Sequence, residues 1–187
     1  MVESELLTGR ARRDLLALAS DFVRHIDGLG AFPPTVRIHG DLGMNNVLWV
    51  DGAPVLMDFD DSQNGAAVQD LALADWLYSV RDRPDLEVLG LWPDPTADRY
   101  AEHSRRRAGV RELLLEGYRS VRAYDPAWER WNQPCLFVRE IFCAAWFCAR
   151  AHDEAFMSLW GKSIDAAFWR RVIRLAELRL GAMSAGL

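Results

Sequence analysis

Apolar residues at helical spacing cover most of the chain. Between residues 10 and 29 they recur every three to four positions, and Gly28 and Gly30 end the pattern. The same spacing returns in four later segments, at 66–82, 99–123, 127–151 and 163–181. A loop is expected at 83–98, because this stretch holds three prolines. The pattern therefore predicts a mostly helical body.

A β-hairpin is predicted where the helical spacing is interrupted. Two short apolar runs, 47–50 and 54–57, flank the pair Asp51-Gly52. An Asp-Gly pair between apolar runs is typical of a tight hairpin, since both residues tolerate a positive φ. We therefore expect an α+β fold, mostly helical, with a small β-hairpin between the helices.

Polar segments lie at both ends of the predicted hairpin. A short apolar run at 36–38 leads into the polar loop 39–45, and a second polar stretch follows at 58–64. Because the two strands of a hairpin are antiparallel, their outer ends are neighbours. We expect the loop and the second polar stretch to meet there, so this is the place where chemistry is expected.

Composition narrows the class of protein. The chain has 187 residues, half of them hydrophobic, and a formal net charge of −5, which indicates a globular domain. The acidic balance argues against a nucleic-acid partner, which would require a basic surface. No apolar run has the length of a transmembrane helix, and the acidic start does not resemble a signal peptide. We expect a cytoplasmic protein with no membrane partner.

The less common residue types are informative as well. Cys135, Cys143 and Cys148 are odd in number and lie in one apolar helical stretch. This favours buried, reduced thiols over disulfides. The eight tryptophans fall mostly on apolar helix faces, where a core position is the default expectation. Lys162 is the single lysine of the chain.

Three polar residues around the hairpin form the candidate site. Asp41 lies on the loop, Asn46 enters the first strand, and Asp58 leaves the second. Oxygen ligands of this kind suit Mg²⁺, which takes its other ligands from water and substrate phosphates. A loop Asp, a following Asn and a metal-binding Asp beyond a hairpin match the kinase pattern. We expect Asp41 to orient the attacking hydroxyl, and Asn46 and Asp58 to bind Mg²⁺ on the nucleotide phosphates.

The neighbouring polar residues are candidates for other roles. Asp60 and Asp61 could add to the metal or phosphate site or cap the following turn, and Asp60 is the stronger candidate. His39 is expected to hold the loop by hydrogen bonds rather than to act as an acid or base. The arginine run 105–107, together with Arg111, is expected to form a solvated helix face rather than a substrate patch.

These residues resemble a known family. The stretch 39–48, His-Gly-Asp-Leu-Gly through Asn-Val-Leu, is similar to the motif of the aminoglycoside phosphotransferase and choline kinase superfamily. Within it, the stretches 58–71, 133–156 and 160–169 are similar to the bacterial stress response kinase A family. The resemblance implies a protein-kinase-like fold, ATP and Mg²⁺ as cofactors, and Ser/Thr protein substrates. It also implies that Asp70 supports the catalytic loop by accepting hydrogen bonds from its backbone.

The resemblance covers nearly the whole chain but not the N-terminal lobe of such kinases. No glycine-rich loop and no Val-Ala-x-Lys-like strand is found, and Lys162 is near the C-terminus. We therefore expect residues 1–187 to form the C-terminal lobe, with the nucleotide-clamping N-terminal lobe absent. Such a lobe would work with an N-lobe supplied separately or would self-associate through its exposed face, and it could be inactive alone.

Three other functions stay open. The substrate could be a small hydroxyl compound of the aminoglycoside type instead of a protein. The chain could also be a non-catalytic, truncated kinase lobe that acts as a binding module. A metal-dependent phosphohydrolase built on His39 and the Asp cluster is the weakest alternative. Such an enzyme would need more His or Asp ligands near the site. The chain has four histidines, and only His39 is near the carboxylates in the sequence.

Overall fold

The chain forms two compact units, which are described separately. The computed structural model describes residues 9–78, 97–161 and 164–185. One unit, called the site unit below, consists of residues 29–136. The other, called the helical unit, consists of residues 1–28 and 137–187.

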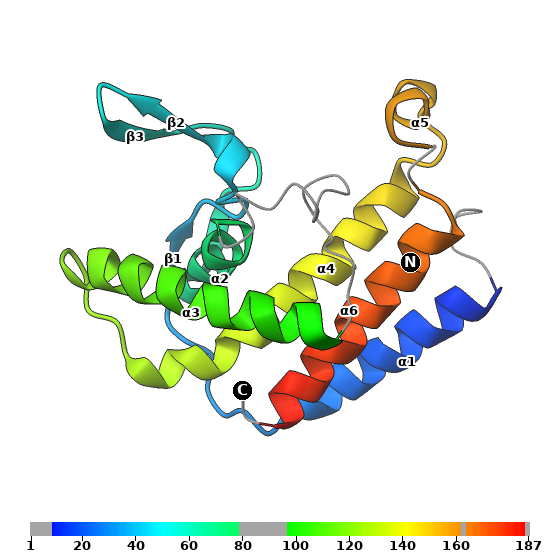
Figure 1. The fold of residues 1–187 in the computed structure, drawn as a ribbon, viewed down its shortest axis with the longest axis horizontal. Coiled ribbons are helices and arrows are strands. Elements are labelled where there is room, and N and C mark those ends of the chain that lie inside the picture. Colours follow the sequence, from blue (N-terminus) through cyan, green and yellow to red (C-terminus); the bar gives the residue numbers. More distant parts are fainter. Residues whose placement is uncertain (1–8, 79–96, 162–163, 186–187) are drawn as a thin grey trace. The chain divides into compact units, whose positions relative to one another are not determined.

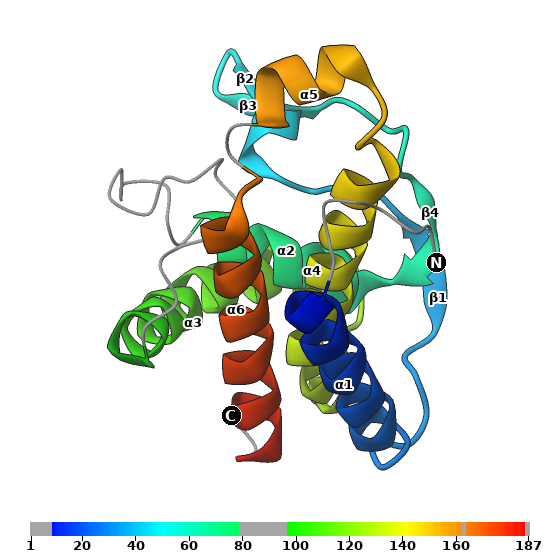
Figure 2. The same cartoon turned by 90° about the vertical axis from the view of Figure 1, so that its right-hand side faces the viewer.

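Two small antiparallel sheets belong to the site unit. Strand β1 (Thr35–Ile38) pairs with β4 (Gln63–Ala66), and β2 (Val47–Val50) pairs with β3 (Ala53–Leu56) (Figures 1 and 2). The turn between β2 and β3 is the predicted pair Asp51-Gly52, and both residues have a positive φ, 51° and 78°. The predicted hairpin and its turn are therefore confirmed.

Strand β4 is an addition that the hydrophobic pattern does not predict. Its residues, Gln-Asn-Gly-Ala, include types that are depleted in strands. Its pairing comes from β1, with Ile38 opposite Gln63. The loop that starts after Ile38 and the segment that ends before Gln63 therefore meet at the same end of this sheet.

The site unit also contains helical elements. They are the short 3₁₀ turn η1 (Met44–Asn46), α2 (Ala67–Tyr78), α3 (Ala97–Arg119), the 3₁₀ segment η3 (Pro126–Trp131) and the start of α4 (Asn132–Ala149). Apolar residues occur on every side of helix α2, and most of its residues are buried, as expected of a helix in the centre of a unit. The predicted helices at 66–82 and 99–123 are confirmed within the described residues. Most of the predicted loop at 83–98 lies outside them.

The expected solvated arginine face is wrong for two of its residues. Arg107 and Arg111 are 6% and 8% exposed, whereas Arg105 is exposed. The two buried arginines are four residues apart, so they lie on the same face of α3. Helical spacing alone does not distinguish a solvated face from one that meets an acidic partner. The partner, Asp75, is described with the candidate site.

The helical unit has its own apolar core. It is built from α1 (Gly9–Ile26), the larger part of α4, the short α5 (Glu154–Trp160) and α6 (Ala166–Ser184). Helices α1 and α6 run side by side (Figure 1). The rings of Phe22 and Phe137 stack with centroids 4.4 Å apart, and Ala176 and Met183 complete the buried cluster. The predicted helical segments of this unit are confirmed, with ends shifted by a few residues.

Two features of the helical unit are not predicted from the sequence. Helix α5 is a separate seven-residue helix, capped by Asp153, whose side chain accepts a hydrogen bond from the N–H of Phe156 at 3.0 Å. The second is an ion pair between Arg179 and Glu140, which are 0% and 5% exposed. A buried charge needs such a partner, because desolvation without one is costly.

The expectations from composition are tested only in part. Within the described residues, the structure contains no helix that is both long and apolar enough to cross a membrane. Cys143 and Cys148 are buried as expected, and Cys135 is partly buried. Burial raises the pKa of the Cys135 thiol to about 12, so this thiol stays protonated at neutral pH. Trp76, Trp131 and Trp169 are core residues, but Trp49 on the hairpin is exposed.

Candidate active site

The loop that follows β1 is fixed to the start of α2. Asp70, in the first turn of α2, accepts hydrogen bonds from the backbone N–H groups of His39 at 2.7 Å and Gly40 at 2.9 Å. Each bond uses a different carboxylate oxygen. Hydrogen bonds to a charged acceptor are short and strong. The loop backbone therefore donates to Asp70 the hydrogen bonds that the family resemblance implies.

His39 connects the loop to the end of the hairpin. The side chain is buried, and its Nδ1 accepts from the N–H of Asp41 at 3.3 Å. This contact assigns the proton to Nε2, which then donates to the carbonyl of Met57 at 2.8 Å. The ring also packs on Phe59, with centroids 4.7 Å apart. Both ring nitrogens take part in local hydrogen bonds, which supports the expected structural role of His39.

Asp41 and Asn46 are in direct contact. The Nδ2 group of Asn46 donates to the backbone carbonyl of Asp41 at 2.9 Å and to its carboxylate Oδ2 at 3.1 Å. The 3₁₀ turn η1 between them closes the five-residue separation. Asp41 is partly buried, and the hydrogen bond from Asn46 orients its carboxylate. This is a suitable arrangement for a group that must meet a substrate hydroxyl.

Asp58 directly follows the hairpin, beside the residue that begins it. The N–H of Met57 donates to the carbonyl of Asn46 at 2.9 Å, which joins the two outer ends of the hairpin. The Asp58 side chain is exposed, and its φ of 59° lies in the left-handed region. Asp tolerates this region better than most residues. The hairpin thus brings the backbones of both predicted metal ligands to one end.

The side chains at this end suit a hard divalent cation. Because Nδ2 of Asn46 is used to hold Asp41, its Oδ1 is the atom that would bind a cation, together with the Asp58 carboxylate. Among the described residues, no three His, Cys, Asp or Glu side chains gather as a metal site. Two protein oxygens still agree with Mg²⁺, which keeps several waters and binds substrate phosphates. The residues present therefore fit this ion in number and type.

Gly40 allows the two halves of the site to approach each other. Its φ is +85°, and a Cβ built on it would lie 2.2 Å from the backbone carbonyl oxygen of Asp61. Only glycine combines this conformation with so close a contact. The loop after β1 and the 58–61 segment therefore touch through their backbones at this point.

Asp60 lies in the segment between the hairpin and β4. It is exposed, in a turn closed by a hydrogen bond from Ser62 N–H to the Phe59 carbonyl at 3.0 Å. Asp61 contributes its backbone at Gly40. The metal or phosphate role of Asp60 stays a prediction.

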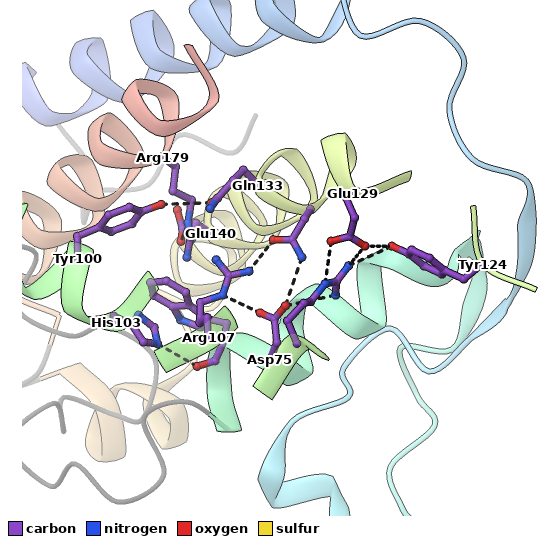
Figure 3. A network of polar contacts seen from close by, with 12 residues as sticks. Asp75, Tyr100, His103, Arg107, Tyr124, Glu129, Gln133, Glu140 and Arg179 are labelled. Atoms are coloured by element: carbon purple, nitrogen blue, oxygen red, sulfur yellow. Dashed lines mark hydrogen bonds and ion pairs between the residues drawn. The ribbon is translucent and has the colours of Figure 1, made fainter. Parts of the chain in front are cut away.

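A buried polar network lies on the same helix that holds the loop (Figure 3). Asp75 of α2 is 0% exposed and forms ion pairs with Arg107 at 2.7 Å and Arg111 at 3.2 Å. Asn132, at the start of α4, donates to the same carboxylate at 3.3 Å and accepts from Arg107. Four polar side chains from three helices are therefore joined inside the site unit.

The network continues from Arg111 to the segment before α4. Arg111 donates two hydrogen bonds to Glu129, at 2.7 and 3.0 Å, and Tyr124 also donates to Glu129. Burial would raise the pKa of Glu129, but the hydrogen bonds from Arg111 and Tyr124 lower it overall. Burial and the Glu129 contact raise the pKa of Tyr124. Glu129 is thus an ionised acceptor and Tyr124 a neutral donor at neutral pH.

Comparison with known proteins agrees with this geometry. Residues 3–124 match the model of the phosphotransferase enzyme family, APH. The match includes the loop, the hairpin and all of α2. The chain belongs to the APH phosphotransferase family. The kinase-like pattern of Asp41, Asn46 and Asp58 therefore lies inside a phosphotransferase domain.

Relatives in this family include bacterial kinases. The chain is 28% identical over 137 residues to the serine/threonine protein kinase RdoA of Salmonella typhimurium. It is 27% identical over 136 residues to stress response kinase A of Escherichia coli. Both matches cover 73% of this chain but only 34% of the relative. The chain thus spans about a third of the length of these APH relatives.

A solved structure shows the same fold. The chain is similar to amicoumacin kinase hAmiN, whose structure is in complex with AMP-PNP, Ca²⁺ and Ami. The TM-score is 0.50 at 20% identity, over 87% of this chain and 48% of the other. The expected α+β, mostly helical, kinase-like fold is confirmed by this likeness.

Sequence reasoning missed several residues that build this APH site. Gln69 accepts a hydrogen bond from Ala66 N–H at 2.8 Å at the β4–α2 junction, and Phe59 packs on His39. Asp75 with its arginines was also missed. One signal was available, because a carboxylate in the otherwise apolar stretch of α2 needs a buried cation. The identity of that cation depends on tertiary contacts.

Proposed function

We propose that this chain carries the catalytic residues of an ATP- and Mg²⁺-dependent phosphotransferase that acts on Ser/Thr side chains of proteins. The observation that carries the proposal is the pair Asp41–Asn46, joined by two hydrogen bonds at the end of the hairpin that Asp58 leaves. Membership in the APH family supports phosphoryl transfer. The names of the RdoA and stress response kinase A relatives support a protein substrate.

Each residue has a defined task in this proposal. Asp41 orients the substrate hydroxyl and accepts its proton as the hydroxyl oxygen bonds to the γ-phosphorus of ATP. The bond from that phosphorus to the β–γ bridging oxygen breaks in the same transfer, and ADP is the leaving group. Asn46 Oδ1 and the Asp58 carboxylate would hold Mg²⁺, which neutralises charge on the phosphate oxygens when it is bound. His39 and Asp70 keep the loop in the required position. Phosphoryl transfer depends mainly on positioning and charge neutralisation, and these contacts supply the positioning.

The domain arrangement is part of the proposal. We propose that residues 1–187 correspond to the C-terminal lobe and work with a nucleotide-clamping lobe, either in a longer protein or as a separate partner. The exposed apolar side chains of the hairpin support this. Leu48, Trp49 and Val55 are between 45% and 61% exposed, and a two-stranded hairpin is marginal without a covering element.

The test is phosphate transfer from ATP by a protein that contains this chain. Asp41→Asn should lower kcat by roughly 10²–10⁴-fold, with casein as the Ser/Thr probe and radiolabelled ATP as donor. Asp51→Asn, an exposed turn residue with positive φ, is the matched control and should keep full activity. Transfer by the Asp41→Asn protein at the rate of the control would exclude the assigned role.

A small-molecule substrate is the second candidate, because the chain shares its fold with amicoumacin kinase. The same assay with an aminoglycoside as acceptor in place of casein distinguishes the two. Phosphate on the small molecule only would replace the protein substrate in the proposal. The phosphohydrolase alternative is weakened, because His39 uses both ring nitrogens in hydrogen bonds.

A further inference from the structure

Helix α2 carries two carboxylates that serve different neighbours. Asp70, in the first turn, accepts from the backbone of the catalytic loop. Asp75, five residues later, is fully buried among the side chains of Arg107, Arg111 and Asn132. Five residues correspond to about 7.5 Å along a helix and roughly 140° around it. The two carboxylates therefore leave α2 on different faces, one toward the loop and one toward the network.

Apolar packing alone does not determine the rotation of α2 about its axis. The helix buries Val68, Leu71, Ala72, Leu73, Ala74 and Trp76. These positions are distributed around the helix, so no single apolar stripe selects one orientation. Hydrophobic attraction has no direction, whereas hydrogen bonds to a charged group have a narrow geometry. A polar contact is thus needed to fix the orientation.

The contacts of Asp75 have this character. Its carboxylate accepts hydrogen bonds from Arg107 of α3 at 2.7 Å and from Asn132 at the start of α4 at 3.3 Å, and it forms an ion pair with Arg111 at 3.2 Å. Arg107 also lies over the ring of Trp76, with its guanidinium carbon 5.5 Å from the ring centroid. Arg111 is held in turn by Glu129 and Tyr124. The donors themselves are therefore held in place.

We propose that Asp75, Arg107, Arg111 and Asn132 are positioning residues that set the catalytic loop through α2. A rotation of α2 by about 20° would move an atom at its outer radius of about 5 Å by roughly 2 Å. This is enough to break the bonds from His39 and Gly40 to Asp70. The loop would then lose the support that places Asp41 beside Asn46. The link to catalysis rests on the proposed function, but the link to loop position does not.

The test is hydrogen exchange at the loop amides. In a protein containing the whole chain, Asp75→Asn should speed exchange of the His39 and Gly40 amides by about tenfold or more. It should also lower kcat with little change in the KM for ATP. The matched control is Glu140→Gln, which removes a buried ion-pair charge from the helical unit. In this variant, exchange of the His39 and Gly40 amides should speed up only as far as the loss of global stability requires.

A milder variant keeps the test decisive if Asp75→Asn does not fold. Asn132→Ala removes the hydrogen bond that Asn132 donates to Asp75 and the one that it accepts from Arg107. It should speed exchange of the same two amides by a smaller factor. Unchanged exchange at His39 and Gly40, or an equal change in Glu140→Gln, would overturn the proposal. If Asp75→Asn exchanges faster but the wild type transfers no phosphate, the positioning role is supported and the proposed function is rejected.

Discussion

At the level of single residues, Gly40 shows why the candidate site tolerates little change. It combines a φ of +85° with a backbone contact to Asp61 that leaves no room for a Cβ. We expect Gly40→Ala to lower the free energy of unfolding by about 1–3 kcal/mol. It should also abolish phosphate transfer, because the loop must move away from the 58–61 segment. Urea unfolding and the transfer assay measure the two effects.

A second glycine separates the two causes of that cost. Gly52 has a similar φ of +78°, but a Cβ built on it would meet nothing within 4 Å. Gly52→Ala should therefore show the conformational cost of the left-handed region without the steric one, and should stay active. Equal loss of activity in both variants would mean that the contact with Asp61 is not what matters at Gly40.

At the level of elements, local signals and long-range pairing explain what the sequence predicts and what it does not. The hairpin is predicted because Asp51 and Gly52 determine the turn by themselves. Strand β4 is missed because its pairing partner β1 ends 25 residues earlier in the chain, at the pair Ile38–Gln63. The α5 helix is missed because seven residues are too few for a periodic pattern.

The junction between β4 and α2 supplies a prediction at this scale. Gln69 reaches back to the N–H of Ala66 at 2.8 Å, as in one half of a capping box. Gln69→Ala should lower the free energy of unfolding by about 1 kcal/mol, measured by urea denaturation. Gln69→Glu is the matched variant. It should keep most of the stability, because a carboxylate also accepts this bond and is favourable near a helix N-terminus. A loss as large as that of Gln69→Ala would contradict the capping role.

At the level of the whole molecule, the residues of the candidate site and the residues that support them were not equally predictable. Asp41, Asn46 and Asp58 could be proposed from spacing alone, because a hairpin places its outer ends together. The support from Asp75 and Arg107 joins positions 32 residues apart in the chain. Nothing in the local pattern of α3 shows that some of its arginines meet an acid, so a solvated face was the natural expectation, and it was wrong for Arg107 and Arg111.

Stability against acid should reveal the outer part of this network. The pKa of Glu129 lies below its ordinary value of 4.5, since hydrogen bonds from Arg111 and Tyr124 outweigh the effect of burial. A carboxylate whose pKa is lower in the folded state than in the unfolded state stabilises the protein at pH values above its unfolded-state pKa. This stabilisation is lost as the pH falls through its folded-state pKa. Glu129→Gln should therefore lower the free energy of unfolding by roughly 1 kcal/mol at neutral pH. This is less than is usual for charged hydrogen bonds, because Glu129 is partly solvated.

The difference between wild type and Glu129→Gln should shrink as the pH falls below about 4.5. Tyr124 does not disturb this comparison. Its pKa is raised from 10.0, so its contribution is complete below that value and decreases only in alkali. Urea unfolding at a series of pH values measures the difference, and Glu112→Gln, an exposed carboxylate on α3, is the control. A gap between wild type and Glu129→Gln that stays constant into acid would show that Arg111 and Tyr124 do not hold the ionised form of Glu129.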